Sequence, residues 1–85
     1  MRTIESFLTD TNFIIDYSGE HQIKFRNERF KIRVTRFNSV YVIFIYETVG
    51  ADDVEYEQTA RSQEEVIKVL IHHANFYQYS IKEEQ

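Results

Sequence analysis

Residues 24–36 hold the side chains of this chain that are best suited to bind a ligand. Six of these thirteen residues are Lys or Arg, although the whole chain of 85 residues has a net charge of −4. The basic residues alternate with four apolar ones, Phe25, Phe30, Ile32 and Val34. This period of two is typical of strands with one buried and one solvated face. The cations should therefore project together from one side of a hairpin, where they could bind an anion.

The apolar run at residues 40–46 supplies aromatic rings for the same surface. A turn at Asn38 and Ser39 pairs Lys31 with Tyr46 and Arg33 with Phe44 on the outer face, and it pairs Ile32 with Ile45 and Val34 with Ile43 on the inner face. Cations beside aromatic rings form a platform of the kind that binds nucleic-acid backbones and bases. The candidate binding residues are Lys24, Arg26, Arg29, Lys31, Arg33, Phe44 and Tyr46.

Two other interpretations of this surface follow from the same pairing. Glu55 and Glu57 continue the rows of Tyr46 and Phe44, so that each row of cation, ring and acid could neutralise itself in solvent. Alternatively, if the helices cover only the other face, the residues from 40 to 46 that point outward form an exposed apolar patch. Phe37 would belong to it, and such patches mark protein interfaces.

No other group of residues predicts metal binding or catalysis. His72 and His73 are adjacent, so on a helix they point about 100° apart and cannot chelate one ion. Residues 52–57 are acidic but lack the Gly and the downstream Glu of a calcium loop. The chain has no Cys and no glycine-rich phosphate loop or nucleophile–base set. We therefore expect a binding module without a metal, a cofactor or enzymatic activity.

The elements that position these residues can be assigned from periodicity. Residues 3–10 predict a short helix capped by Thr3, and Ser62 with Glu65 opens a long helix with a broad apolar stripe. Between them we expect an antiparallel meander of four or five strands. A two-residue turn at Asn27-Glu28 would place Arg26 opposite Arg29 and Lys24 opposite Lys31.

The predicted fold is therefore α+β, with one face of the sheet packed on the long C-terminal helix. Residues 1–79 form a single domain and residues 80–85 a frayed tail. The sequence begins without the apolar run of a signal peptide, and its longest apolar run is far too short to span a bilayer. We expect a cytoplasmic protein that does not bind membranes.

Two families resemble this chain. The order of helix, strands and helix resembles the double-stranded-RNA-binding domain, although that family places lysines where this chain has Ser62-Gln63-Glu64-Glu65. The length, the N-terminal helix at residues 4–8, the hairpin at residues 30–46 and the acidic C-terminal third are similar to small phage and mobile-element accessory proteins, including type II anti-CRISPR inhibitors. That resemblance implies a module that blocks or modulates another protein.

The sequence thus predicts a protein-interaction module whose partner is another protein or a second copy in a homodimer. The alternative is a nucleic-acid-binding domain that uses the basic hairpin at residues 24–36.

Overall fold

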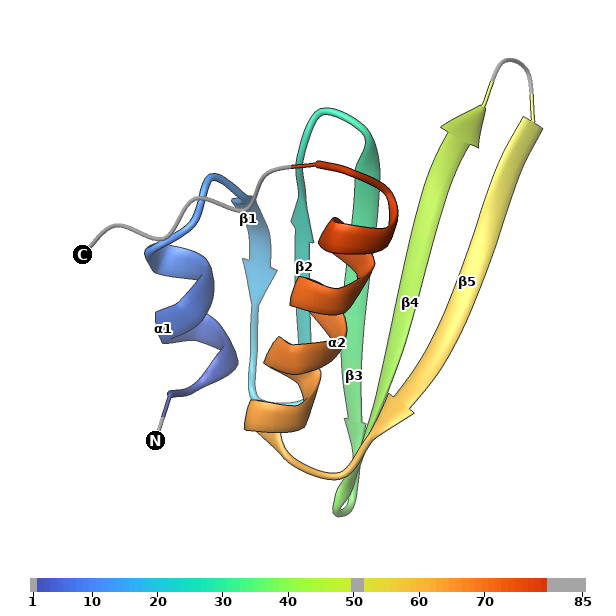
Figure 1. The fold of residues 1–85 in the computed structure, drawn as a ribbon. Coiled ribbons are helices and arrows are strands. Elements are labelled where there is room, and N and C mark those ends of the chain that lie inside the picture. Colours follow the sequence, from blue (N-terminus) through green and yellow to red (C-terminus); the bar gives the residue numbers. More distant parts are fainter. Residues whose placement is uncertain (1, 50–51, 80–85) are drawn as a thin grey trace.

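The computed structural model describes residues 2–49 and 52–79, and it confirms the α+β architecture (Figure 1). The elements in chain order are α1 (Ile4–Thr9), β1 (Ile14–Ser18), β2 (Gln22–Arg26), β3 (Phe30–Phe37), β4 (Val40–Val49), β5 (Asp52–Ala60) and α2 (Gln63–Phe76). The strands form one antiparallel meander in the order β1-β2-β3-β4-β5. The predicted tail at residues 80–85 lies outside the described residues.

The pairing of β3 with β4 follows the prediction residue by residue. Ile32 lies opposite Ile45 and Arg33 opposite Phe44. Asn38 takes a positive φ of 56° in the turn between the strands, a backbone conformation that Asn tolerates better than most residues. The alternation of apolar residues and the turn at Asn38 therefore specify the same pairing of β3 with β4.

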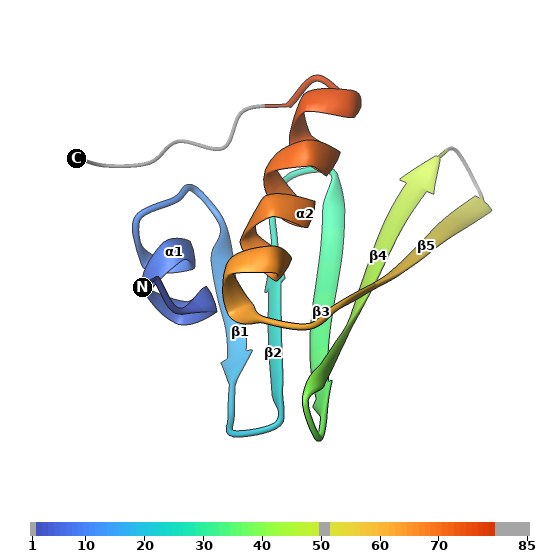
Figure 2. The same ribbon diagram turned by 60° about the horizontal axis from the view of Figure 1, so that its bottom comes forward.

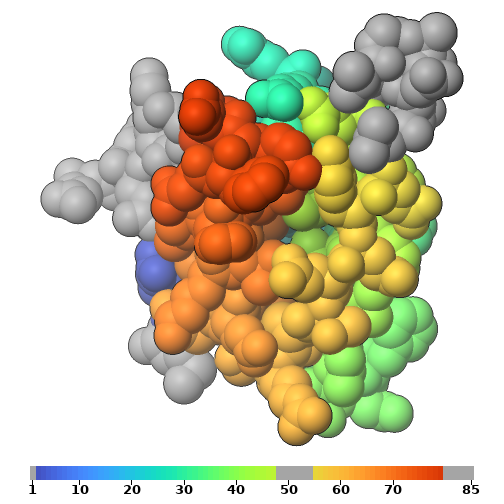
Figure 3. All heavy atoms as spheres, turned by 45° about the vertical axis from the view of Figure 1, so that its right-hand side comes forward, coloured from blue at the N-terminus to red at the C-terminus, as the bar shows by residue number. Residues whose placement is uncertain are grey.

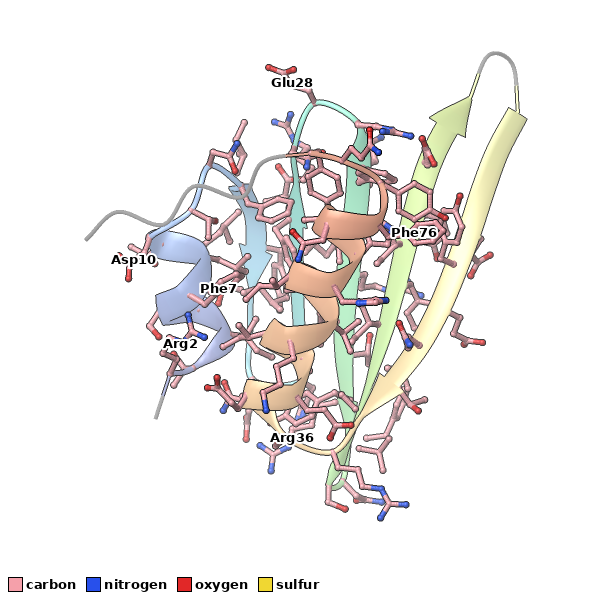
Figure 4. The ribbon with its side chains drawn as sticks, viewed as in Figure 1. Arg2, Phe7, Asp10, Glu28, Arg36 and Phe76 are labelled. Atoms are coloured by element: carbon pink, nitrogen blue, oxygen red, sulfur yellow. The ribbon has the colours of Figure 1, made fainter. Side chains whose placement is uncertain are left out.

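The predicted pairing of β2 with β3 is wrong by two residues. Lys24 lies opposite Arg33, and Arg26 lies opposite Lys31. Asn27 does not occupy the turn: its backbone N–H donates to the Phe30 carbonyl, and its side-chain oxygen accepts from the N–H groups of Arg29 and Phe30. The turn therefore consists of Glu28 and Arg29, and Figure 4 shows Glu28 at its tip. A shift of two residues keeps every side chain on its face.

Both helices lie on the same face of the sheet. Phe7 of α1 and Leu70 of α2 belong to one buried cluster with Phe25, Phe30 and Ile43 of the strands. Phe7 points from α1 toward this core in Figure 4, and the helices stay on one side of the sheet in Figure 2. The other face, which we call the outer face, is covered by no element of the described chain.

Each helix begins at a side-chain cap. Thr3 and Ser6 form a reciprocal capping box on α1. On α2 the Ser62 hydroxyl accepts from the N–H of Glu65, whereas the Glu65 carboxylate accepts from the N–H of Arg61, one residue before the cap. In the side view of Figure 3, α2 in orange and red lies over the strands beside yellow β5. Neither helix is long and apolar enough to cross a membrane.

Candidate interaction surface: the outer face of the sheet

The outer face presents the side chains that alternate with the buried ones. On β2 and β3 they are mostly basic, on β4 they are apolar or aromatic, and on β5 the described ones include two acids. They are Gln22, Lys24 and Arg26, then Lys31, Arg33, Thr35 and Phe37, then Val40, Val42, Phe44 and Tyr46, then Glu55, Glu57 and Thr59. The pairing confirms the two predicted rows, Lys31–Tyr46–Glu55 and Arg33–Phe44–Glu57.

Arg33 and Phe44 form the centre of this surface. The guanidinium carbon of Arg33 lies 4.5 Å from the centre of the Phe44 ring. This is a cation–π contact, which contributes about 0.5–1 kcal/mol at an exposed site. Nε of Arg33 is buried and has no hydrogen-bond partner, while the rest of the side chain is half-buried. The terminal nitrogens of the stacked guanidinium are not buried and make no hydrogen bond within the described chain, so they can donate to a ligand.

Of the four cations of the outer face, one is neutralised by direct contact with an acid of the described chain and three are not. Arg26 donates from Nε to both carboxylate oxygens of Asp16, at 3.0 and 3.1 Å. Lys24, Lys31 and Arg33, by contrast, form no ion pair with any residue that the structure describes. The cations on β3 and the acids on β5 lie two strands apart, which is about 9–10 Å. The cation and the acid of each row are therefore not joined by a salt bridge. The charge stays divided between the two sides of β4.

Arg29 is separated from the other candidate residues. Its Nε donates to Oε1 of Glu47 at 2.6 Å, and its terminal nitrogen donates to the Tyr77 carbonyl at 3.1 Å. Glu47 is only 5% exposed and lies on the helix side of β4. Arg29 therefore links the β2–β3 turn to β4 and to the end of α2, and it does not take part in the outer face.

Glu47 borders an aromatic cluster under the C-terminal end of α2. The Tyr56 hydroxyl donates to the Glu47 carboxylate at 3.3 Å, and its interaction with the Tyr77 hydroxyl, together with burial, raises the pKa of Tyr56 to about 12. Nδ1 of His73 lies 2.9 Å from the Tyr79 hydroxyl, while Nε2 is buried without a partner. Burial also lowers the pKa of His73 and raises that of Tyr79 to about 12. Tyr56, His73 and Tyr79 are therefore neutral near pH 7, and they pack under the end of the helix.

The sequence held a signal for Glu47 and His73. Glu47 continues the inward alternation of Ile43 and Ile45, so an acid at that position must be buried and paired. His73 lies on the buried stripe of α2 between Leu70 and Tyr77, where it borders the core. His72 is exposed.

Comparisons with family models, with curated proteins and with solved structures find no match to this chain. The resemblances to the double-stranded-RNA-binding domain and to phage accessory proteins therefore stay predictions. Among the described residues, no group of three or more His, Cys, Asp or Glu side chains is placed to hold a metal ion.

Proposed function

We propose that this chain is a protein-interaction module without chemistry of its own, which binds a protein partner through the outer face of its sheet. The observation that carries the proposal is the one-sided packing of the helices. It leaves Phe37 58% exposed and Val40 37% exposed beside the half-buried rings of Phe44 and Tyr46. Clustered apolar side chains with a charged rim are typical of protein interfaces.

The charge distribution of the outer face favours a protein partner over a nucleic acid. Lys24, Lys31 and Arg33 are unpaired within the described chain and favour an anion. However, Glu55 and Glu57 lie on the other side of the aromatic stripe and would repel a phosphate backbone that crossed it. A partner with both signs of charge fits the whole face, whereas a polyanion fits only half of it.

Two exposed phenylalanines allow a matched test of this proposal. Phe37 lies on the outer face and Phe76, which is 71% exposed, lies at the end of α2 on the helix side (Figure 4). Each is replaced by the photoreactive p-benzoyl-phenylalanine, which keeps the aromatic ring, and the producing cells are irradiated. We expect a cross-linked protein from position 37 and none from position 76. Equal products from both positions, or none from position 37, would remove the proposal.

A double substitution tests the rings themselves. Phe44→Ser with Tyr46→Ser should abolish the cross-link from position 37, because half-buried aromatic residues at the centre of an interface dominate its binding energy. The far-UV circular dichroism spectrum should remain that of the folded chain. An undiminished cross-link in the folded double variant would show that these rings are not part of the interface.

A further inference from the structure

We propose that the partner of the outer face is a second copy of this chain, packed face to face about a two-fold axis that runs along β4. This inference rests on the proposed function and names the partner of the same surface. The carrying observation is the order of charge across the face. Lys31 and Arg33 lie on β3, the apolar and aromatic side chains on β4, and Glu55 and Glu57 on β5.

A two-fold axis parallel to β4 makes this order self-complementary. Such an axis exchanges the two sides of β4 and keeps each row at its own height along the strand. Arg33 of one copy then faces Glu57 of the second copy, and Lys31 faces Glu55. Because the interface is isologous, each pair occurs twice. An axis across the strands would instead place the basic side of one copy over the basic side of the other.

The distances between packed sheets suit these pairs. Two sheets pack about 10 Å apart, a gap that an Arg or Lys and a Glu reaching from opposite sides can span. Within one copy the same charges lie in the same plane, two strands apart, and form no salt bridge among the described residues. The second copy therefore offers Lys31 and Arg33 the acidic partners that their own sheet places out of reach.

The apolar stripe would form the centre of the interface. Phe44 and Tyr46 meet their counterparts across the axis, where aromatic pairs contribute about 0.5–1.5 kcal/mol beyond the area they bury. The three strands that face their counterparts, β3 to β5, cover roughly 14 by 26 Å at ordinary strand spacing and rise, or about 700 Å² over both copies. This lies below the usual range for specific interfaces, so we expect a weak, reversible dimer with a dissociation constant in the upper micromolar range.

Lys24 provides a matched control for the charge pattern. It has the same charge as Lys31, is also exposed and also has no ion pair within the described chain, but it lies on β2, two strands away from the axis. In the proposed dimer it overhangs β5, the edge strand of the second copy, and faces no acid. Lys24→Glu should therefore change the dissociation constant by less than about twofold, whereas Lys31→Glu should raise it about tenfold.

A charge-exchange experiment tests the proposal by sedimentation equilibrium at low salt. One variant carries Lys31→Glu and Arg33→Glu, so that both sides of its stripe are acidic. The other carries Glu55→Lys and Glu57→Lys, so that both sides are basic. Each alone should be monomeric, because like charges meet across the axis, and their mixture should form a heterodimer of twice 10.3 kDa. If Arg33→Glu disturbs the fold, Lys31→Glu mixed with Glu55→Lys repeats the test at exposed positions only.

Three results would overturn the second copy as the partner. They are a wild-type chain that stays monomeric up to about millimolar concentration, a mixture that associates no better than either variant alone, and a Lys24→Glu variant that is as impaired as Lys31→Glu. The cross-link from position 37 then tests whether the proposed function still holds without the homodimer. A product with a different protein would support the proposed interaction module and exclude only the homodimer. The absence of any product would exclude both proposals.

Discussion

Replacing Arg29 by Met should destabilise the chain strongly, although Arg29 lies in an exposed turn. The substitution leaves the Glu47 carboxylate, which is 5% exposed, with only the Tyr56 hydroxyl at 3.3 Å. Removing one partner of a buried ion pair costs about 3–5 kcal/mol. The Arg29 side chain is 46% exposed, so water can replace part of the lost contact. We therefore expect a loss of about 2–3 kcal/mol in the free energy of unfolding.

Urea unfolding followed by circular dichroism measures this loss. With a slope of about 1 kcal/mol per molar urea, as expected for a chain of this size, the midpoint should fall by about 2–3 M. Lys31→Met is the matched control, because Lys31 lies two residues from Arg29 and carries the same charge. Its side chain is exposed and forms no ion pair in the described chain. It should change the free energy of unfolding by less than about 0.5 kcal/mol.

A double-mutant cycle isolates the pair itself. Glu47→Met alone leaves Arg29 free to turn toward water and should cost less than Arg29→Met. The double variant replaces the ion pair by two apolar side chains and should recover most of the stability, to within about 1 kcal/mol of wild type. If the two single effects add to within about 0.5 kcal/mol, Arg29 and Glu47 are not coupled and the reasoning fails.

Three further predictions concern the helices and the basic hairpin. Because burial lowers the pKa of His73 below its ordinary 6.5, the unfolded chain binds the proton first, so stability should be full well above pH 6.5 and decline as the pH falls through 6.5. Unfolding of His73→Phe should lack this part of the pH dependence. Ser62→Ala removes the acceptor for the Glu65 N–H and should cost about 1 kcal/mol in the same urea assay. Fluorescence polarisation with mixed-sequence single- and double-stranded oligonucleotides should show no binding that weakens with salt. Salt-sensitive binding that Lys31→Glu abolishes would favour the nucleic-acid alternative.

Most of the sheet could be predicted because its strands alternate cleanly between buried and exposed residues. At the β3–β4 hairpin this alternation and the turn at Asn38 specify the same pairing. At the β2–β3 hairpin the alternation leaves a choice between pairings that differ by two residues, because both keep every side chain on its face. The side chain of Asn27 decides between them by accepting two backbone hydrogen bonds, which places the turn one residue later.

Other features depend on contacts between distant parts of the chain. Phe13, Ile15 and Tyr17 alternate along the chain at β1, but of the three only Phe13 is buried, and a bulge interrupts the pairing with β2 after Ile15. The position of α1 on the same face as α2 follows from the burial of Phe7 between the two helices and the sheet. Local periodicity does not contain that information, since α1 is apolar on one side whichever face it covers.

The basic hairpin therefore divides into residues that hold the fold and residues that remain available for a partner. Six cations within residues 24–36 look equivalent in the sequence, yet Arg29 pairs with a buried acid while Lys31 meets no acid within the described chain. Two positions separate them, and both project from the same hairpin. Removing the charge at Arg29 should weaken the fold, whereas removing it at Lys31 should weaken only association. Stability and association, measured on the same two variants, thus separate the structural use of this charge from its use in binding.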